Sequence, residues 1–299
     1  MKINRKEMLF MSNNLNNQTT KKKKNSYFNS NPVMNGLNKV NERTSAGSLS
    51  ASYGGIAVKT VFFLLMVVVG IMLYLVLNNL VFTNAAYQGE VFTLNYDSLE
   101  YQVSTVELAM FGAVTVVGII CQILACFVAP TIPVTGSLFS VCEGFFISFT
   151  IFKILKGYEY LGVLALMVTV LVVMVMNLLY AKQIIRATHK FRMVMVTLFA
   201  TVIGISILMT IGFLIPFTRP IVGSVMANPA ISIAFTVISV AIAALFLISD
   251  FAMIDTVVNE NYPKKYEWRA SFGLAFTVIW LYVKILDLII QIFVNSRDN

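Results

Sequence analysis

The chain has 299 residues, of which 58% are hydrophobic and only 12% charged, with a formal net charge of +8 and a mean hydropathy of +0.80. Because a soluble domain carries roughly 25% charged residues, this composition excludes an ordinary soluble fold. Residues 60–89 and 108–142 contain no Asp, Glu, Lys or Arg at all. Since a bilayer core about 30 Å thick requires about 20 apolar residues of a helix, the sequence predicts a polytopic membrane protein.

The first 50 residues differ from the rest. They contain the run Lys21–Lys24 and eleven asparagines but no apolar core of the length that a signal peptide needs. We therefore expect residues 1–50 to form a disordered, basic, Asn-rich cytoplasmic tail and residues 51–299 to form the transmembrane domain. The lysines either contact anionic headgroups or only set the topology, and composition favours the second alternative.

Seven transmembrane helices in an all-α fold account for the charge-free runs. Prolines mark several of their limits, because proline cannot continue a helix: Pro130 and Pro133 divide the second and third spans, Pro216 ends the fifth and Pro229 opens the sixth. The expected spans are residues 56–80, 105–128, 134–155, 160–181, 190–215, 230–257 and 270–294.

Lysine and arginine predict the orientation of these spans. Seventeen of them fall on the side of the amino terminus and only four on the other side, while Lys284 lies within a span. The amino terminus is therefore expected in the cytoplasm and the carboxyl terminus outside. The loop 81–104, with three acidic residues and no basic one, is then external.

Ionisable side chains inside the spans are the candidate functional residues, because each costs at least about 2.5–3.5 kcal/mol at the bilayer centre. Four others lie at span ends, where we expect interfacial side chains that reach water: Glu107, Glu159, His189 and Glu267. The candidates within the spans are Glu143, Asp250, Asp255, Lys284 and Asp287.

Glu143 precedes a glycine, which lets another helix approach closely. It is either a protonatable, cation-attracting group or a neutral acid hydrogen-bonded to a neighbouring helix. Asp250 and Asp255 are five residues apart, so they point about 140° apart on one helix. We expect one to face the bundle interior and the other the cytoplasmic mouth.

Lys284 and Asp287 are three residues apart and therefore share one helix face. They either neutralise each other, or Lys284 neutralises a carboxylate of the sixth span. Such a pair can be a structural lock or a proton-operated switch, and the spacing alone does not choose between them. A retinal protein is disfavoured, because no acidic residue lies one turn before Lys284.

No catalytic or cofactor signature is present. With His189 as the single histidine, there is no histidine-based zinc cluster, and neither G-x-S-x-G nor G-x-x-x-x-G-K-[ST] occurs. Cys121, Cys126 and Cys142 all fall in spans, where cysteine behaves as a small hydrophobe. We expect neither an enzyme nor a resident cofactor, and no nucleic-acid partner.

The chain resembles the Bax inhibitor-1 family of transmembrane Bax inhibitor motif proteins, in its bacterial branch. The resemblance covers roughly residues 30–299 and rests on SNPVMNGL, ASYGGIAVKT, APTIPVTGSLFSVCEGFFIS, SDFAMIDTVV and YPKKYEWRASFGLAFTVIWLYVKIL. It implies six helices around a central seventh, in a bacterial plasma membrane. Some members are described as pH-sensitive calcium leak channels, in which aspartates of spans six and seven share a proton.

Carried over to this sequence, the aspartate of span six is Asp255, but the partner position in span seven is Lys284, where the family has an acid. A lysine cannot share a proton in this way and repels calcium, while Asp287 lies one turn further on. The arginine that latches span two in calcium-leak members also has no counterpart here; span two offers only Glu107.

Two functions remain in competition. The first is a pH-sensitive cation or calcium leak, in which the five ionisable residues within the spans form a polar interior and protonation sets the gate. The second is a non-conducting regulator that binds a membrane-anchored protease or a stress-response partner, with Lys284 and Asp287 as a lock. A secondary transporter is disfavoured, because glycines and prolines mark no matched broken helices in two halves.

Overall fold

The computed structural model describes residues 49–84, 89–96, 99–226 and 228–297. The predicted tail therefore lies outside the described residues, apart from Leu49 and Ser50. Within the described chain, seven helices are long and apolar enough to cross a membrane, as predicted. Their ranges are Tyr53–Phe82, Thr105–Phe127, Ala129–Ile154, Tyr160–Ala181, His189–Phe213, Pro229–Asn259 and Lys264–Ser296.

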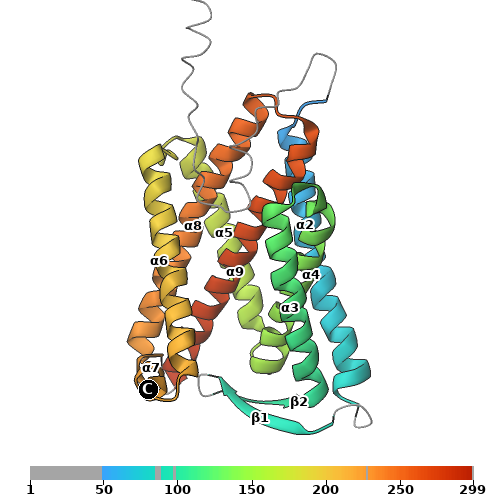
Figure 1. Cartoon of the computed structure of the whole chain (residues 1–299), viewed down its shortest axis with the longest axis vertical. Helices are drawn as coiled ribbons and strands as arrows, with labels where there is room; N and C mark the ends of the chain where they lie inside the picture. Colours follow the sequence, from blue (N-terminus) through green and yellow to red (C-terminus); the bar gives the residue numbers. More distant parts are fainter. Residues whose placement is uncertain (1–48, 85–88, 97–98, 227, 298–299) are drawn as a thin grey trace, which may run out of the picture.

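The helices form one bundle with two ends, which Figure 1 shows at the top and bottom. We call the end where α2 begins the loop face, and the end that carries the two strands the hairpin face. The elements in chain order are α2 (Tyr53–Leu77), η2 (Asn78–Phe82), β1 (Val91–Tyr96), β2 (Leu99–Ser104), α3 (Thr105–Phe127), η3 (Ala129–Thr131), α4 (Ile132–Phe149), η4 (Thr150–Ile154), α5 (Tyr160–Ala181), α6 (His189–Leu214), α7 (Arg219–Met226), α8 (Pro229–Asn259), η5 (Lys264–Tyr266) and α9 (Glu267–Arg297).

Polar residues start several helices by capping them. Ser52, Ser104, Thr188 and Asn228 each accept a hydrogen bond from a backbone N–H in the first turn of α2, α3, α6 and α8. These N–H groups have no partner within their helix, so a capping oxygen satisfies them. The apolar runs between the caps then continue as helix, because an apolar bilayer requires internal backbone hydrogen bonds.

A two-stranded sheet covers the hairpin face, which composition did not predict. β1 and β2 pair antiparallel, in register from Val91 opposite Ser104 to Tyr96 opposite Leu99. The Val103 side chain is buried, and the Tyr101 ring contacts Phe149 edge-on at 6.1 Å between ring centroids. The sheet therefore packs onto the ends of α3 and α4, as Figure 1 shows.

Helix α9 occupies the centre of the bundle and crosses it diagonally (Figure 1). Each of the six other spanning helices contacts it through a defined pair of groups. These are Phe63 of α2 with Phe272, the Cys126 carbonyl of α3 with Arg269, Phe139 of α4 with Phe272, the Gly162 carbonyl of α5 with Tyr282, Phe199 of α6 with Trp280, and Asp250 of α8 with Thr277. The predicted arrangement of six helices around a seventh is confirmed.

Helices α2 and α4 approach each other closely at two glycines, Gly70 and Gly144. A Cβ atom placed on Gly70 would lie 2.1 Å from the Val141 carbonyl oxygen, and one on Gly144 would lie 2.0 Å from that of Val67. Neither position has room for any side chain. The glycine after Glu143 thus allows the close helix contact that the sequence predicted.

Candidate functional site

Glu143 and Asp287 line the same cavity in the spanning region. Glu143 comes from the middle of α4 and Asp287 from the second half of α9, and the cavity between them has a volume of about 360 Å³. The remaining lining is apolar except for Thr150 at the start of η4. Within the described residues the Glu143 carboxylate makes no hydrogen bond or ion pair with the protein. Glu143 therefore faces this cavity and is not hydrogen-bonded to a neighbouring helix within the described residues.

Asp287 connects Lys284 to helix α8. The Lys284 Nζ lies 3.9 Å from the Asp287 Oδ2, so the two residues neutralise each other along one face of α9. The Gln291 Nε2 donates to the Asp287 Oδ1 at 3.1 Å and to the Thr236 Oγ1 of α8 at 3.0 Å. The Gln291 Oε1 is buried and accepts no hydrogen bond from any described residue. Asp287 therefore joins the cavity that Glu143 also lines to an amine and to an amide whose oxygen has spare accepting capacity.

Asp250 lies away from this cluster, in the packed interior. Its side chain is fully buried, and its Oδ2 accepts a hydrogen bond from the Thr277 hydroxyl of α9. This contact fixes the relative level of the antiparallel helices α8 and α9. Asp250 is therefore the one of the two aspartates on α8 that faces the bundle interior, where the 140° separation led us to expect one of them.

Asp255 lies nearer the loop face. Its Oδ1 accepts a hydrogen bond from the Tyr53 hydroxyl at 2.9 Å, and its Oδ2 accepts one from the Tyr180 hydroxyl. Tyr53 begins α2 and Tyr180 ends α5, so Asp255 joins three helices where they leave the bundle. Asp255 is thus the member at the mouth of the bundle.

Two of the four residues expected at water-exposed span ends are instead buried, and that prediction was wrong for them. Glu107 has no exposed surface; it pairs with the Lys153 Nζ at 2.7 Å and accepts from the Tyr74 hydroxyl at 2.8 Å. Glu267 is also fully buried and pairs with Lys59 of α2. Each acid sits at the start of a helix, but the sequence carried no signal for partners 46 and 208 positions away.

The other two residues lie at the surface as expected. His189 is exposed at the first turn of α6. The Glu159 Oε1 accepts a hydrogen bond from the Gly157 N–H at 2.9 Å, and this bond lowers the pKa of the Glu159 carboxyl. Glu159 therefore stays ionised at the hairpin face.

The structure shows no candidate metal centre within the part of the chain that it describes. No three His, Cys, Asp or Glu side chains gather there as a metal site would require. The described cysteines Cys121, Cys126 and Cys142 are free thiols. Glu143 and Asp287 bring only two carboxylates to the cavity.

Comparison with known protein families shows which family the chain belongs to. The family model described as Bax inhibitor 1 like matches residues 10–293, which is nearly the whole sequence. The chain belongs to the Bax inhibitor 1 like family. No curated protein and no solved structure matches the sequence. The family match also covers most of residues 1–50, whose predicted disorder lies outside the described residues.

The two positions that the Bax inhibitor-1 resemblance pairs do not meet in this chain. Asp255 is five residues from Asp250 toward the loop face, and Lys284 is seven residues from Thr277 toward the hairpin face. At 1.5 Å per residue, Asp255 and Lys284 are therefore about 18 Å apart along the bundle. Lys284 neutralises Asp287 on its own helix, and it is Glu143 that the structure places with Asp287.

Proposed function

We propose that this member of the Bax inhibitor 1 like family is a pH-sensitive cation leak, with calcium as the first ion to test. The observation that supports the proposal is the shared cavity of Glu143 and Asp287 between α4 and α9. Ionisable groups are expensive at this depth and are typical of ion or proton pathways. Carboxylate and amide oxygens are also the ligands that hard cations prefer.

Lys284 gives the site its expected pH dependence. At neutral pH the amine and the Asp287 carboxylate balance each other, and Asp287 holds Gln291 toward Thr236 of α8. Protonating Asp287 removes the charge that holds both Lys284 and the Gln291 amide. The link between α8 and α9 then weakens, so conduction is expected to rise as the pH falls.

The test is cation flux in proteoliposomes, measured with calcium and with potassium from about pH 5 to 8. Wild type should conduct more at the acidic end. Glu143→Gln removes a carboxylate from the cavity and should lower the flux. Asp287→Asn resembles protonated Asp287, so it should raise the flux at neutral pH and flatten its pH profile. Asp255→Asn is the matched control, because it also removes one carboxylate from a spanning helix but lies at the loop face. Equal flux in all four proteins would contradict the proposal.

The alternative function is a non-conducting regulator that binds a membrane-anchored protease. The ion pair between Lys284 and Asp287 favours it, because an internal amine already supplies the counter-charge that a bound cation would provide. A silent wild type with a pH-dependent flux in Lys284→Asp would support the regulator. Deletion of residues 1–45 should then impair the regulatory effect, whereas it should spare a channel. Neither function as proposed involves catalysis.

A further inference from the structure

A second, larger hollow lies on the surface of the bundle, between α2 and α5. It has a volume of about 850 Å³, and its floor is formed by side chains of α9 such as Val278 and Tyr282. Both walls carry exposed apolar side chains, among them Val61 and Leu65 on α2 and Val163 and Val170 on α5. We call this hollow the α2–α5 groove. It faces outward from two spanning helices, so its surroundings are the hydrocarbon of the bilayer.

The few polar groups in the groove are already hydrogen-bonded within the protein. The Thr60 hydroxyl donates to the Ile56 carbonyl, and the Thr169 hydroxyl donates to the Ala165 carbonyl. The Tyr282 hydroxyl donates to the Gly162 carbonyl. Their donors are therefore not available to an ion or a polar ligand, and the groove is suited to a hydrocarbon chain.

The length of the groove matches one leaflet. Its α5 wall runs from Tyr160 to Met174, which is about 21 Å at 1.5 Å per residue. Its α2 wall runs from Thr60 to Ile71, about 16 Å on the same basis. Half of a hydrocarbon core about 30 Å thick is about 15 Å, so one acyl chain of a phospholipid spans most of the groove.

Two residues of opposite charge lie where the groove reaches the hairpin face. Glu159 lines this end, beside the exposed ring of Tyr160. Lys156 is exposed and close enough to Glu159 to contribute to its lowered pKa, after the larger effect of the Gly157 N–H. The Glu159 carboxylate and the Lys156 amine carry charges opposite to the ammonium and the phosphate of an aminophospholipid.

We propose that the α2–α5 groove binds one phospholipid with a primary-amine headgroup, such as phosphatidylethanolamine, with an acyl chain between α2 and α5 and the headgroup at Lys156 and Glu159. This site is distinct from the cavity of Glu143 and Asp287, with which it shares only the buried side chain of Ile147. The proposal therefore does not depend on whether the protein conducts ions.

The test is native mass spectrometry of the full chain, reconstituted in vesicles of phosphatidylethanolamine and phosphatidylcholine and then extracted. Wild type should retain phosphatidylethanolamine in clear preference. Val170→Trp fills the groove and should reduce this retention several-fold. Leu171→Trp is the matched control, because Leu171 is also exposed on α5 but does not line the groove. Glu159→Gln should retain lipid but lose the preference for the amine headgroup.

Several results would overturn the proposal. The first is that Val170→Trp retains as much phosphatidylethanolamine as wild type. The second is that Leu171→Trp loses as much of this lipid as Val170→Trp does. The third is that wild type retains phosphatidylethanolamine and phosphatidylcholine equally. If a second copy of the chain occupied the groove instead, the protein would form a dimer without bound lipid, and Val170→Trp would dissociate this dimer. If Val170→Trp fails to fold, Val163→Trp blocks the same face two turns earlier and is judged by the same criteria.

Discussion

The Glu107 carboxylate lies at the contact of three elements under the hairpin. It begins α3, its partner Lys153 comes from η4 and its hydroxyl donor Tyr74 from α2. A buried charge is costly unless it is paired and hydrogen-bonded, and here both conditions are met. Losing one partner leaves the other charge in an apolar environment, so this pair should be sensitive to single substitutions.

We predict that Glu107→Gln lowers the free energy of unfolding by about 3–5 kcal/mol, because it leaves the Lys153 amine without its counter-charge. The double variant Glu107→Gln/Lys153→Met should recover most of the loss, since it removes both charges. Thermal melting in detergent compares the stability of the two variants with that of wild type. Glu100→Gln, an exposed acid on β2, should change stability by no more than about 0.5 kcal/mol. A double variant as unstable as the single one would contradict a pair-specific effect.

Glu159 gives a pH dependence with a definite sign. Its pKa in the folded chain is lowered from 4.5, chiefly by the Gly157 N–H. The stabilisation is therefore present above the pKa of the unfolded chain and is lost as the pH falls through the folded pKa. Hydrogen-exchange protection of the Gly157 amide should therefore fall as the pH drops through the folded pKa of Glu159. Glu159→Ala should remove this dependence, whereas Lys156→Ala should keep most of it. An unchanged dependence in Glu159→Ala would assign it to another group.

For single residues, the sequence predicts which side chains interact only when the two residues are close together on one helix. The spacing of Lys284 and Asp287 and the opposite directions of Asp250 and Asp255 follow from helix geometry, and the structure confirms both. The shared cavity of Glu143 and Asp287 depends on how α4 and α9 are rotated against each other, which no local spacing contains. The buried pairs of Glu107 and Glu267 were missed for the same reason.

Helices α2 and α4 illustrate what determines packing between elements. Their backbones touch at Gly70 and Gly144, where small residues permit the close approach that helices in lipid require. Glu143 precedes one of these glycines, so the contact also sets how α4 presents this acid to the cavity. The orientation of the candidate site therefore depends on Gly70 and Gly144, two residues without a functional side chain.

We predict opposite effects of the same substitution at two glycines. Gly144→Ala places a methyl group against the Val67 carbonyl and should cost about 1–3 kcal/mol. Gly112→Ala on α3 meets nothing within 4 Å and should stabilise the chain by up to about 1 kcal/mol, because alanine is the better helix former. Thermal melting of both variants checks the prediction. Destabilisation of similar size in both would show that the α2–α4 contact is not tight.

The elements that the sequence predicted are those that a bilayer imposes. Long runs without charge indicate spanning helices, so all seven spans were located, with limits that differ by at most six residues. The strands were missed because two six-residue runs with mixed polarity resemble any external loop. Their pairing depends on the packing of Val103 and Tyr101 against the bundle. The short α7 was missed likewise.

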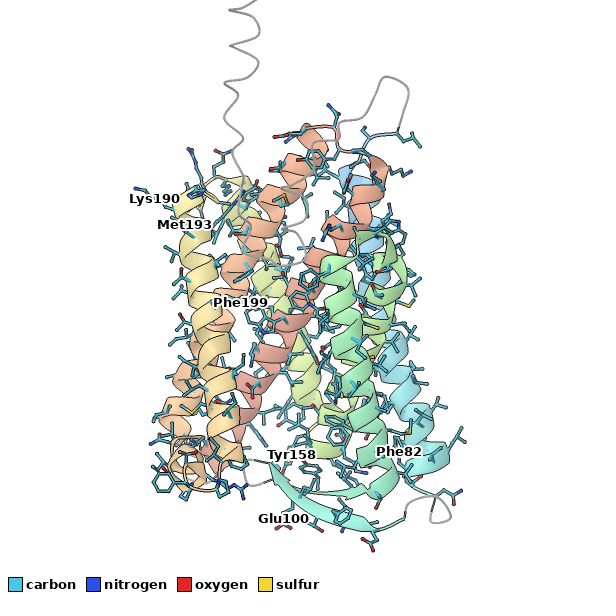
Figure 2. All side chains as sticks on the ribbon, viewed as in Figure 1. Phe82, Glu100, Tyr158, Lys190, Met193 and Phe199 are labelled. Carbon is cyan, nitrogen blue, oxygen red and sulfur yellow. The ribbon has the colours of Figure 1, made fainter. Side chains whose placement is uncertain are left out.

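The whole molecule has a strongly uneven charge distribution between its two ends. Most of the basic residues that the structure describes lie at the loop face, and Figure 2 shows Lys190 at that end and Glu100 at the other. Cytoplasmic loops of membrane proteins are enriched in lysine and arginine. We therefore propose that the loop face is cytoplasmic and the hairpin face external, in the plasma membrane of a bacterium.

This orientation can be tested in intact cells with single cysteines in a variant that lacks Cys121, Cys126 and Cys142. A membrane-impermeant thiol reagent should label Glu100→Cys from outside and should label Lys190→Cys only after the cells are broken. Both positions are exposed, so accessibility to the reagent does not limit the result. Labelling of Lys190→Cys in intact cells would reverse the assigned orientation.

The central place of α9 has a consequence for biosynthesis. The ribosome makes α9 after the six helices that contact it, so these helices enter the membrane before their common packing partner exists. Until then Lys59 of α2 lacks its counter-charge, the Glu267 carboxylate, and the fully buried Asp250 of α8 lacks one of its partners, the Thr277 hydroxyl. Polar groups without partners are expensive in lipid. The nascent chain therefore passes through a stage in which quality-control machinery can distinguish it from the finished protein.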